Sequence, residues 1–204
     1  MLTSSMSVST RDRIVDEAVR LFSEHGYSGT PITKIESAAG LKPGAGGLYR
    51  HFKTKEEILA AGVERQLGRL DALRDIRRVL TPLDDLAAEL TVTARVILAE
   101  LDNESDLLRI LASEARARPK LLTEATKQLV SSSFDEFARW ILERADPTLS
   151  RETAASIATV GIGSLFSSRL MRDVLGTPQE IGDDELVRTW VMMMIATLEA
   201  ATKP

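Results

Sequence analysis

The stretch Gly26–Phe52 decides the fold; it reads GYSGTPITKIESAAGLKPGAGGLYRHF. Just upstream, Thr10–His25 is an amphipathic run in which Ile14, Ala18 and Phe22 recur on one helical face. Glycines follow two short helical patterns, and a Pro/Gly-rich turn separates the second pattern from a third. The sequence therefore predicts three short helices around one apolar centre, in the arrangement of a helix-turn-helix.

The boundaries of these helices follow from their capping residues. Thr10 is the predicted N-cap of the first helix and Thr30 that of the second, with Pro31 at the first helical position. Pro43 suits the first turn of the third helix, because the N–H that proline lacks would have no partner there. The second and third helices are expected to bury five apolar residues: Ile32, Ile35, Ala39, Leu48 and Phe52.

This region resembles the N-terminal DNA-binding domain of the TetR family of transcriptional regulators. The residues that carry the resemblance are Ala18, Leu21, Phe22, Gly26, Tyr27, Thr30, Ile35, Ala38, Ala39, Gly40, Leu41, Gly47, Leu48, Tyr49, His51, Phe52, Lys55, Glu56 and Leu59. The resemblance implies a DNA-binding domain at residues 8–65 and a helical ligand-binding and dimerisation domain at residues 66–204. It also implies a homodimer, most often a repressor, that binds a pseudo-palindromic double-stranded DNA operator and responds to an unidentified small-molecule effector.

The chain departs from the family pattern at one place. The family usually has four residues between the Leu or Val after Ala-Gly and the Leu or Ile before the Tyr, whereas this chain has six, Lys42–Gly47. Three of the six are glycine, and a glycine inside a helix costs about 1 kcal/mol relative to alanine. We therefore expect a longer turn rather than a longer helix.

The candidate DNA contacts lie on the second and third helices, on the turn between them, and just after. They are Thr33, Lys34, Lys42, Pro43, Gly44, Ala45, Gly46, Gly47, Tyr49, Arg50, His51 and Lys55. Arg50 can donate two bonds to guanine or one to phosphate. The resemblance places Tyr49 and Lys55 at phosphates; for Tyr49 and His51, packing inside the protein is the alternative. Glycines in the turn allow backbone N–H groups to approach phosphate closely.

Composition favours an all-α protein of about nine helices. The chain has 204 residues, 44% of them hydrophobic and 4% aromatic, and lacks strand-like runs of β-branched residues. Without cysteine there is neither a disulfide nor thiol chemistry, and with only two histidines a histidine metal site is not expected. Since no catalytic set of residues is recognisable either, the sequence predicts no enzyme, no cofactor and no metal.

Charge is divided unevenly along the chain. The net charge is −4, but residues 1–55 hold eight Lys/Arg against five Asp/Glu, and the remainder holds 18 against 25. A basic N-terminal part on an acidic remainder fits a protein that meets phosphate with one end. An asymmetry of this size also arises by chance, so it gives mild support only.

The rest of the chain predicts further helices. Thr54 and Glu57 form a capping box for a long helix that should run to about Val79. Ser150 and either Asp183 or Asp184 are the N-caps expected for the last two helices. The helices predicted after the long one are Leu83–Leu101, one around Leu107–Ala115, Lys120–Ala145, Ser150–Leu175 and Glu185–Ala201.

Two further sites are predicted in this second part, and packing in the core of one subunit is the alternative for both. A ligand pocket between helices is expected to be lined by Phe134, Phe137, Trp140, Phe166 and Met171. In the family that the chain resembles, the last two helices pair with their copies in a dimer. The residues expected at that interface are Ala154, Ala158, Gly161, Leu165, Trp190 and Met194.

The N-terminus is expected to carry no signal peptide, since residues 1–9 lack a basic start and an apolar core. No run approaches 18 apolar residues, so no membrane span is expected and the cytoplasm is the predicted location. The leading prediction is a dimeric, ligand-responsive DNA-binding regulator. The alternative is a helical protein-interaction module that has lost specific DNA binding, for which the glycine-rich insertion offers a cause.

Overall fold

The computed structural model of the chain describes residues 9–65, 68, 85–127, 131–144 and 149–202. All the regular secondary structure of these residues is helical, which confirms the all-α prediction. The elements are α1 (Thr10–His25), α2 (Ile32–Ala38), the 3₁₀ turn η1 (Leu48–Arg50), a helix described at residues 55–65, α4 (Leu86–Asn103), α5 (Ser105–Glu114), α6 (Pro119–Thr126), α7 (Ser132–Arg144), α8 (Arg151–Arg169), the π-helical segment η3 (Leu170–Val174) and α9 (Asp183–Ala201).

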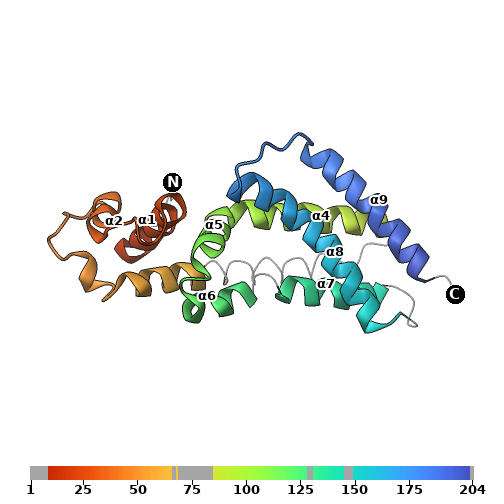
Figure 1. Cartoon of the computed structure of the whole chain (residues 1–204), viewed down its shortest axis with the longest axis horizontal. Coiled ribbons are helices and arrows are strands. Elements are labelled where there is room, and N and C mark those ends of the chain that lie inside the picture. The colour runs from red at the N-terminus through yellow and green to blue at the C-terminus, as the bar shows by residue number, and fades with distance from the viewer. Residues whose placement is uncertain (1–8, 66–67, 69–84, 128–130, 145–148, 203–204) are drawn as a thin grey trace, which may run out of the picture.

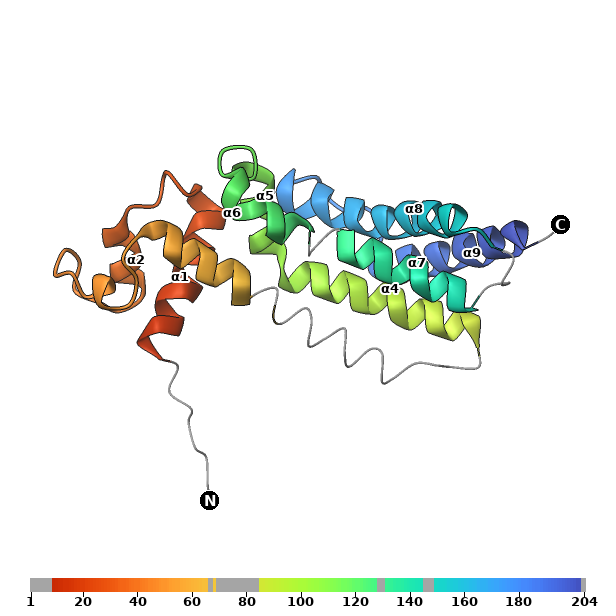
Figure 2. The ribbon, with the colours of Figure 1, turned by 90° about the horizontal axis from the view of Figure 1, so that it is seen from below.

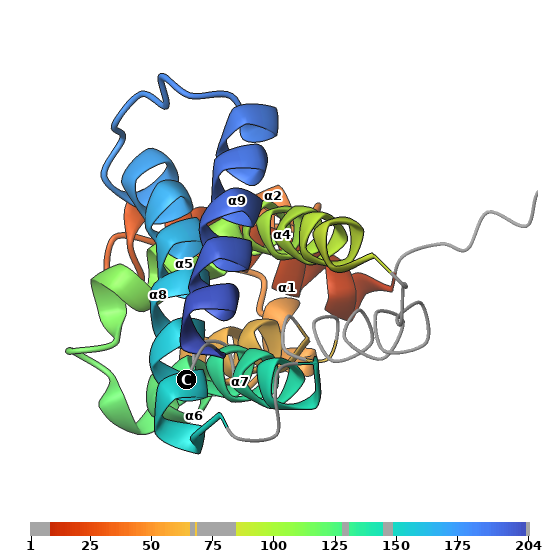
Figure 3. The ribbon, with the colours of Figure 1, turned by 90° about the vertical axis from the view of Figure 1, so that its right-hand side faces the viewer.

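The molecule is elongated, with the N-terminal helices at one end and the C-terminal helix at the other (Figure 1). We call α1, α2, η1 and the helix at residues 55–65 the head, and α4 to α9 the body. Helices α5 and α6 lie between the head and the rest of the body (Figures 1 and 2). Helices α4, α7, α8 and α9 lie side by side in the body, as the end-on view shows (Figure 3).

The head does not have a core of its own. Its buried apolar residues, among them Ile14, Phe22, Ile35 and Leu48, form one cluster with Leu107, Ile110 and Leu111 of α5 and Leu122 of α6. A unit this small buries too little surface to be stable alone, and the body supplies the missing apolar contacts. The predicted boundary between residues 65 and 66 stays a prediction, because residues 66–67 lie outside the described ranges.

The body has a second core between α4, α7, α8 and α9. Phe137 stacks on Trp140 with ring centroids 5.2 Å apart and an interplanar angle of 6°. Phe137 also approaches Trp190, whose indole N–H donates to the carbonyl of Gly161 at 2.8 Å. An added Cβ at Gly161 would lie 2.9 Å from the sulfur of Met194, so glycine permits the close approach of α8 and α9 at this level.

Several predicted helix starts differ from the structure. Ser9 caps α1 instead of Thr10, because its hydroxyl oxygen accepts from the Asp12 N–H at 3.1 Å. Thr30 does not cap α2; its hydroxyl lies within hydrogen-bond reach of the carbonyls of Leu21 (3.0 Å) and Gly26 (2.9 Å), and α2 begins one residue after Pro31. The predicted cap of α8 is confirmed, since the Ser150 hydroxyl accepts from the Thr153 N–H at 3.0 Å.

The predicted single helix Lys120–Ala145 is described as two elements, α6 and α7, on either side of residues 128–130, which lie outside the described ranges. The Thr54 hydroxyl accepts from the Glu57 N–H at 3.1 Å, so the predicted cap of the next helix is confirmed. Its predicted course to about Val79 falls on residues that lie outside the description.

A cluster of charged side chains joins α4, α8, η3 and α9. Arg169 is fully buried, and its guanidinium donates to Asp102 (2.7 and 3.1 Å) and to Asp183 (2.9 and 2.8 Å). Arg172 pairs with Asp102 and with Asp173. Asp183, a predicted N-cap, is the first residue of α9 and accepts from Arg169 instead. A buried guanidinium is tolerated because carboxylates satisfy it on both sides.

Helix α8 together with η3 (Arg151–Val174) is long and apolar enough to cross a membrane by length and composition. A core helix meets the same test, and here Ala154, Leu165 and Arg169 are packed fully inside the body. The feature is therefore weak evidence for a membrane span.

Candidate DNA-binding surface

The turn between α2 and η1 is built on glycines with left-handed backbone. Gly40, Gly44 and Gly46 each have a φ of 73°, a conformation that other L residues adopt only with strain. The predicted long turn is confirmed, because residues 43–47 are turns and bends and only Leu48–Arg50 form a 3₁₀ helix. The prediction of Pro43 in a helical first turn is wrong, since the chain does not become helical until Leu48.

A buried carboxylate holds this turn against α2. Glu36 is 1% exposed, and its Oε2 accepts from the backbone N–H of Gly44 at 2.7 Å. The N–H of Leu41 donates to the Glu36 carbonyl at 2.7 Å. This role of Glu36 was not predicted from the sequence. Its position could have indicated the role, because residue 36 lies four positions after Ile32 and so on the apolar face of α2.

Most of the predicted DNA contacts are exposed on α2 and along residues 42–51, which together we call the tip of the head. Thr33, Lys34, Lys42, Pro43, Gly44, Ala45, Tyr49, Arg50 and His51 are exposed, and Gly46 and Gly47 are half-buried. Tyr49 is 57% exposed, which argues against the alternative that it packs between helices. Within the described part of the chain, neither Lys42 nor Arg50 forms an ion pair. Their charges are therefore available to an external anion.

Lys55 is the exception among the predicted phosphate contacts, because its ammonium group already has partners inside the protein. Its ammonium group donates to the backbone carbonyls of Tyr27 and Thr30, the latter at 2.7 Å. The Nζ also lies 4.2 Å from the centre of the Tyr27 ring. Burial, together with the nearby charge of Arg118, lowers the pKa of Lys55 below its usual value. Lys55 thus fixes the turn after α1 from inside.

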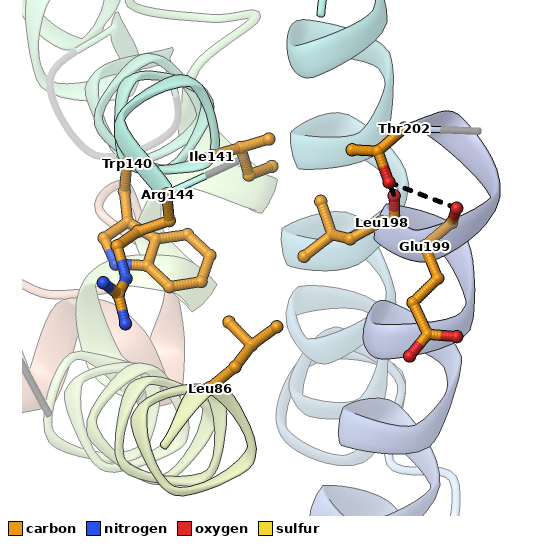
Figure 4. Close-up of a pocket in the computed structure, with 7 residues that line it drawn as sticks. All are labelled: Leu86, Trp140, Ile141, Arg144, Leu198, Glu199 and Thr202. Atoms are coloured by element: carbon orange, nitrogen blue, oxygen red, sulfur yellow. Dashed lines mark hydrogen bonds between the residues drawn. The ribbon is translucent and has the colours of Figure 1, made fainter. Parts of the chain in front are cut away.

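The predicted pocket residues do not share one environment. Phe137 is buried in the core of the body and Phe134 packs against that core, whereas Met171 is 47% exposed. Phe166 is half-buried. Trp140 alone of the five lines a cavity of about 350 Å³ between α4, α7 and α9, together with Leu86, Ile141, Arg144, Leu198, Glu199 and Thr202 (Figure 4).

The residues predicted at a dimer interface pack mainly within one subunit. Ala154, Ala158 and Leu165 are fully buried, so their side chains are not available to a second copy. Gly161, Trp190 and Met194 are also largely buried, but they line a groove of about 220 Å³ between α8 and α9. The placement of Ala154, Ala158 and Leu165 has a physical cause: small residues on one helical face permit close packing with any neighbour, inside or outside the chain.

Within the described residues, no three His, Cys, Asp or Glu side chains are grouped to hold a metal ion.

Comparison with known proteins agrees with this geometry. Residues 14–61 match the model of the family described as "Bacterial regulatory proteins, tetR family". The chain is 23% identical over 197 residues to the HTH-type transcriptional regulator AcrR of Shigella flexneri. This alignment covers 95% of this chain and 91% of AcrR. The match to the TetR family of bacterial regulatory proteins lies within the head, at residues 14–61.

Sequence similarity to known regulators is also concentrated in the head. The chain is 43% identical over 54 residues to IcaR of Staphylococcus epidermidis, a negative transcriptional regulator of a biofilm operon. That match spans 26% of this chain and only 28% of IcaR. The fold of the whole chain resembles FadR of Bacillus subtilis in complex with stearoyl-CoA, with a TM-score of 0.65, 17% identity and coverage of 91% and 97%.

Proposed function

We propose that this TetR-family protein is a cytoplasmic transcriptional repressor that binds double-stranded DNA as a homodimer. The observation that carries the proposal is that Lys42, Tyr49 and Arg50 are exposed at the tip of the head. The apolar core of the head supports this segment from beneath. Arginine suits guanine edges or phosphate, and tyrosine suits phosphate. Two tips would enter successive major grooves, with half-sites about 34–36 Å apart or a multiple of that distance.

The test is selection of duplexes from a random-sequence pool by the full-length protein, followed by gel shift of the recovered sequence. We expect a pseudo-palindrome that is bound far more tightly than a scrambled duplex of the same length. Recovery of no preferred sequence would refute the proposal and favour the protein-interaction module instead.

The dimer contact is proposed on the outer side of α8 and α9. Val160 is 69% exposed, and Met192 and Met193 are 58% and 57% exposed. Val160 and Met193 line the groove between the two helices, and a second copy would remove these exposed apolar side chains from water. In sedimentation we expect a dimer for the wild type and a monomer for Val160→Asp. The exposed Thr153→Asp change on the same helix is the matched control.

The effector is proposed to be a small, largely apolar molecule that binds in the cavity beside Trp140. Its volume of about 350 Å³ lies in the range of small-molecule sites, and Trp140, Leu86, Ile141 and Leu198 supply apolar walls. The solved FadR relative is in complex with stearoyl-CoA, so a series of fatty acids and acyl-CoA thioesters of increasing length is the first library. A true effector raises the melting temperature, perturbs Trp140 fluorescence and releases the selected duplex. A ligand that does not produce all three effects is not an effector.

A further inference from the structure

The contact between head and body is centred on Tyr27, the second residue after α1. Its backbone N–H donates to Oε1 of Glu114 at 3.1 Å, and its ring packs on Phe22 with centroids 5.2 Å apart. Glu114 is the last residue of α5 and is 9% exposed. A buried hydrogen bond between a body carboxylate and a head amide is directional, so it constrains orientation as well as distance.

A second body residue completes the contact. The guanidinium carbon of Arg118 lies 3.9 Å from the centre of the Tyr27 ring, and Arg118 also pairs with the other carboxylate oxygen of Glu114. Lys55 of the head lies 4.2 Å from the same ring centre. One carboxylate therefore balances two cations that share one aromatic ring. We call Glu114, Arg118, Tyr27 and Lys55 the Tyr27 clamp.

The clamp is tied to α6 as well as to α5. The N–H groups of Ala117 and Arg118 donate to the Glu114 carbonyl at 3.0 and 2.8 Å, which closes a tight turn between the two helices. The N–H of Leu122 donates to the Arg118 carbonyl at 3.1 Å, and Leu122 is fully buried in the core shared with the head. A shift of α6 along its axis must therefore move Arg118 relative to Tyr27.

We propose that the Tyr27 clamp sets the orientation of the head on the body, so that Glu114 and Arg118 are positioning residues for DNA binding. The proposal rests on the proposed function, and it adds the route by which a change in the body reaches the tip. Glu114 ends α5 and Arg118 directly precedes α6, and these two helices lie between the head and the rest of the body (Figure 1). Both residues therefore act on the tip through Tyr27 and Lys55.

A direct test of the clamp needs no DNA. Hydrogen exchange at the Tyr27 amide is compared in the wild type, Glu114→Ala and Glu114→Gln. The alanine variant removes the acceptor, and we expect exchange to rise about tenfold or more at Tyr27 while α8 and α9 stay protected. Glutamine keeps an acceptor oxygen and should restore most of the protection. Unchanged exchange in Glu114→Ala overturns the clamp, and loss of protection throughout the chain shows a role in folding only.

The functional test uses the duplex selected by the wild type and versions of it with one or two base pairs inserted between half-sites. A loosened head should lose about tenfold in affinity for the selected spacing and discriminate less between spacings, while binding of scrambled DNA stays unchanged. Arg118→Met, with Arg116→Met in the same turn as the exposed control, tests the cation. The double variant Glu114→Gln/Arg118→Met restores the charge balance and should bind better than Glu114→Gln alone.

Two results distinguish this proposal from the proposed function. If the wild type selects no sequence, the proposed function fails, and hydrogen exchange still decides whether the clamp exists. If the wild type selects a sequence but the clamp variants keep both affinity and spacing preference, the positioning role is overturned and the function stands.

Discussion

The two ends of the head use positive charge in different ways. At the tip, Lys42 and Arg50 are exposed and form no ion pair within the described residues. At the base, Lys55 donates to two backbone carbonyls, and Arg118 of the body packs on Tyr27 and pairs with Glu114. A Lys or Arg in a DNA-binding sequence is thus a candidate DNA contact only if its side chain is not already paired within the folded protein.

The largest effect expected from this comparison is on stability, for Lys55→Met. The substitution leaves the carbonyls of Tyr27 and Thr30 without their donor while keeping the aliphatic stem. We expect a loss of about 2 kcal/mol, or a melting temperature lower by roughly 4–8 °C. Thermal melting checks this, with the exposed Lys53→Met as control. A lower salt dependence of DNA binding without a change in melting would return Lys55 to the phosphate contacts.

Arg50→Ala should act on recognition rather than stability. Arg50 is exposed, so its loss should leave the melting temperature unchanged. If it contacts a guanine, affinity for the selected duplex falls about tenfold or more, and affinity for scrambled DNA falls less. Fluorescence anisotropy with both duplexes measures the two losses. Equal losses on both would mean that Arg50 touches phosphate alone.

Lys42→Ala should have a smaller and more uniform effect. A lysine at a phosphate contributes counterion release, which is the same for every sequence. We expect affinity to fall equally on selected and scrambled duplexes, and the slope of log K against log salt to decrease by about 1. Titration at several salt concentrations gives the slope. An unchanged slope would place Lys42 outside the interface.

The smallest expected effect is on stability at low pH, and it involves Arg169 and Arg172. Like Lys55 and Arg118 at the base of the head, these cations bind groups within the protein. Hydrogen bonds from Arg172 and Arg169 hold the pKa values of Asp173 and Asp183 below the usual 3.8. The unfolded chain therefore takes up protons first. The stabilisation is complete above pH 3.8 and is lost as the pH falls through the lower folded values. Melting temperatures from pH 5 downward should fall, and Asp173→Asn should flatten the decline. An equal decline in both proteins would contradict this account.

The sequence by itself determined much of the head. Apolar spacing on α1, glycines at helix ends and the excess of glycine at 42–47 predicted the buried face and the long turn, because these signals are local. The likeness of residues 14–61 to the TetR family has the same origin, since the matched residues serve one compact local motif. Local signals also identified the Ser150 and Thr54 caps.

Tertiary structure alone decided how the charged and small residues are used. Periodicity cannot show that Lys55 turns inward to the Tyr27 carbonyl, that Glu36 holds the Gly44 amide, or that Arg169 is buried among carboxylates. Nor can it tell a small-residue face that packs within a subunit, as at Ala158, from one that meets a second copy. These outcomes depend on partners distant in the sequence, and a partner is defined only when the chain has folded.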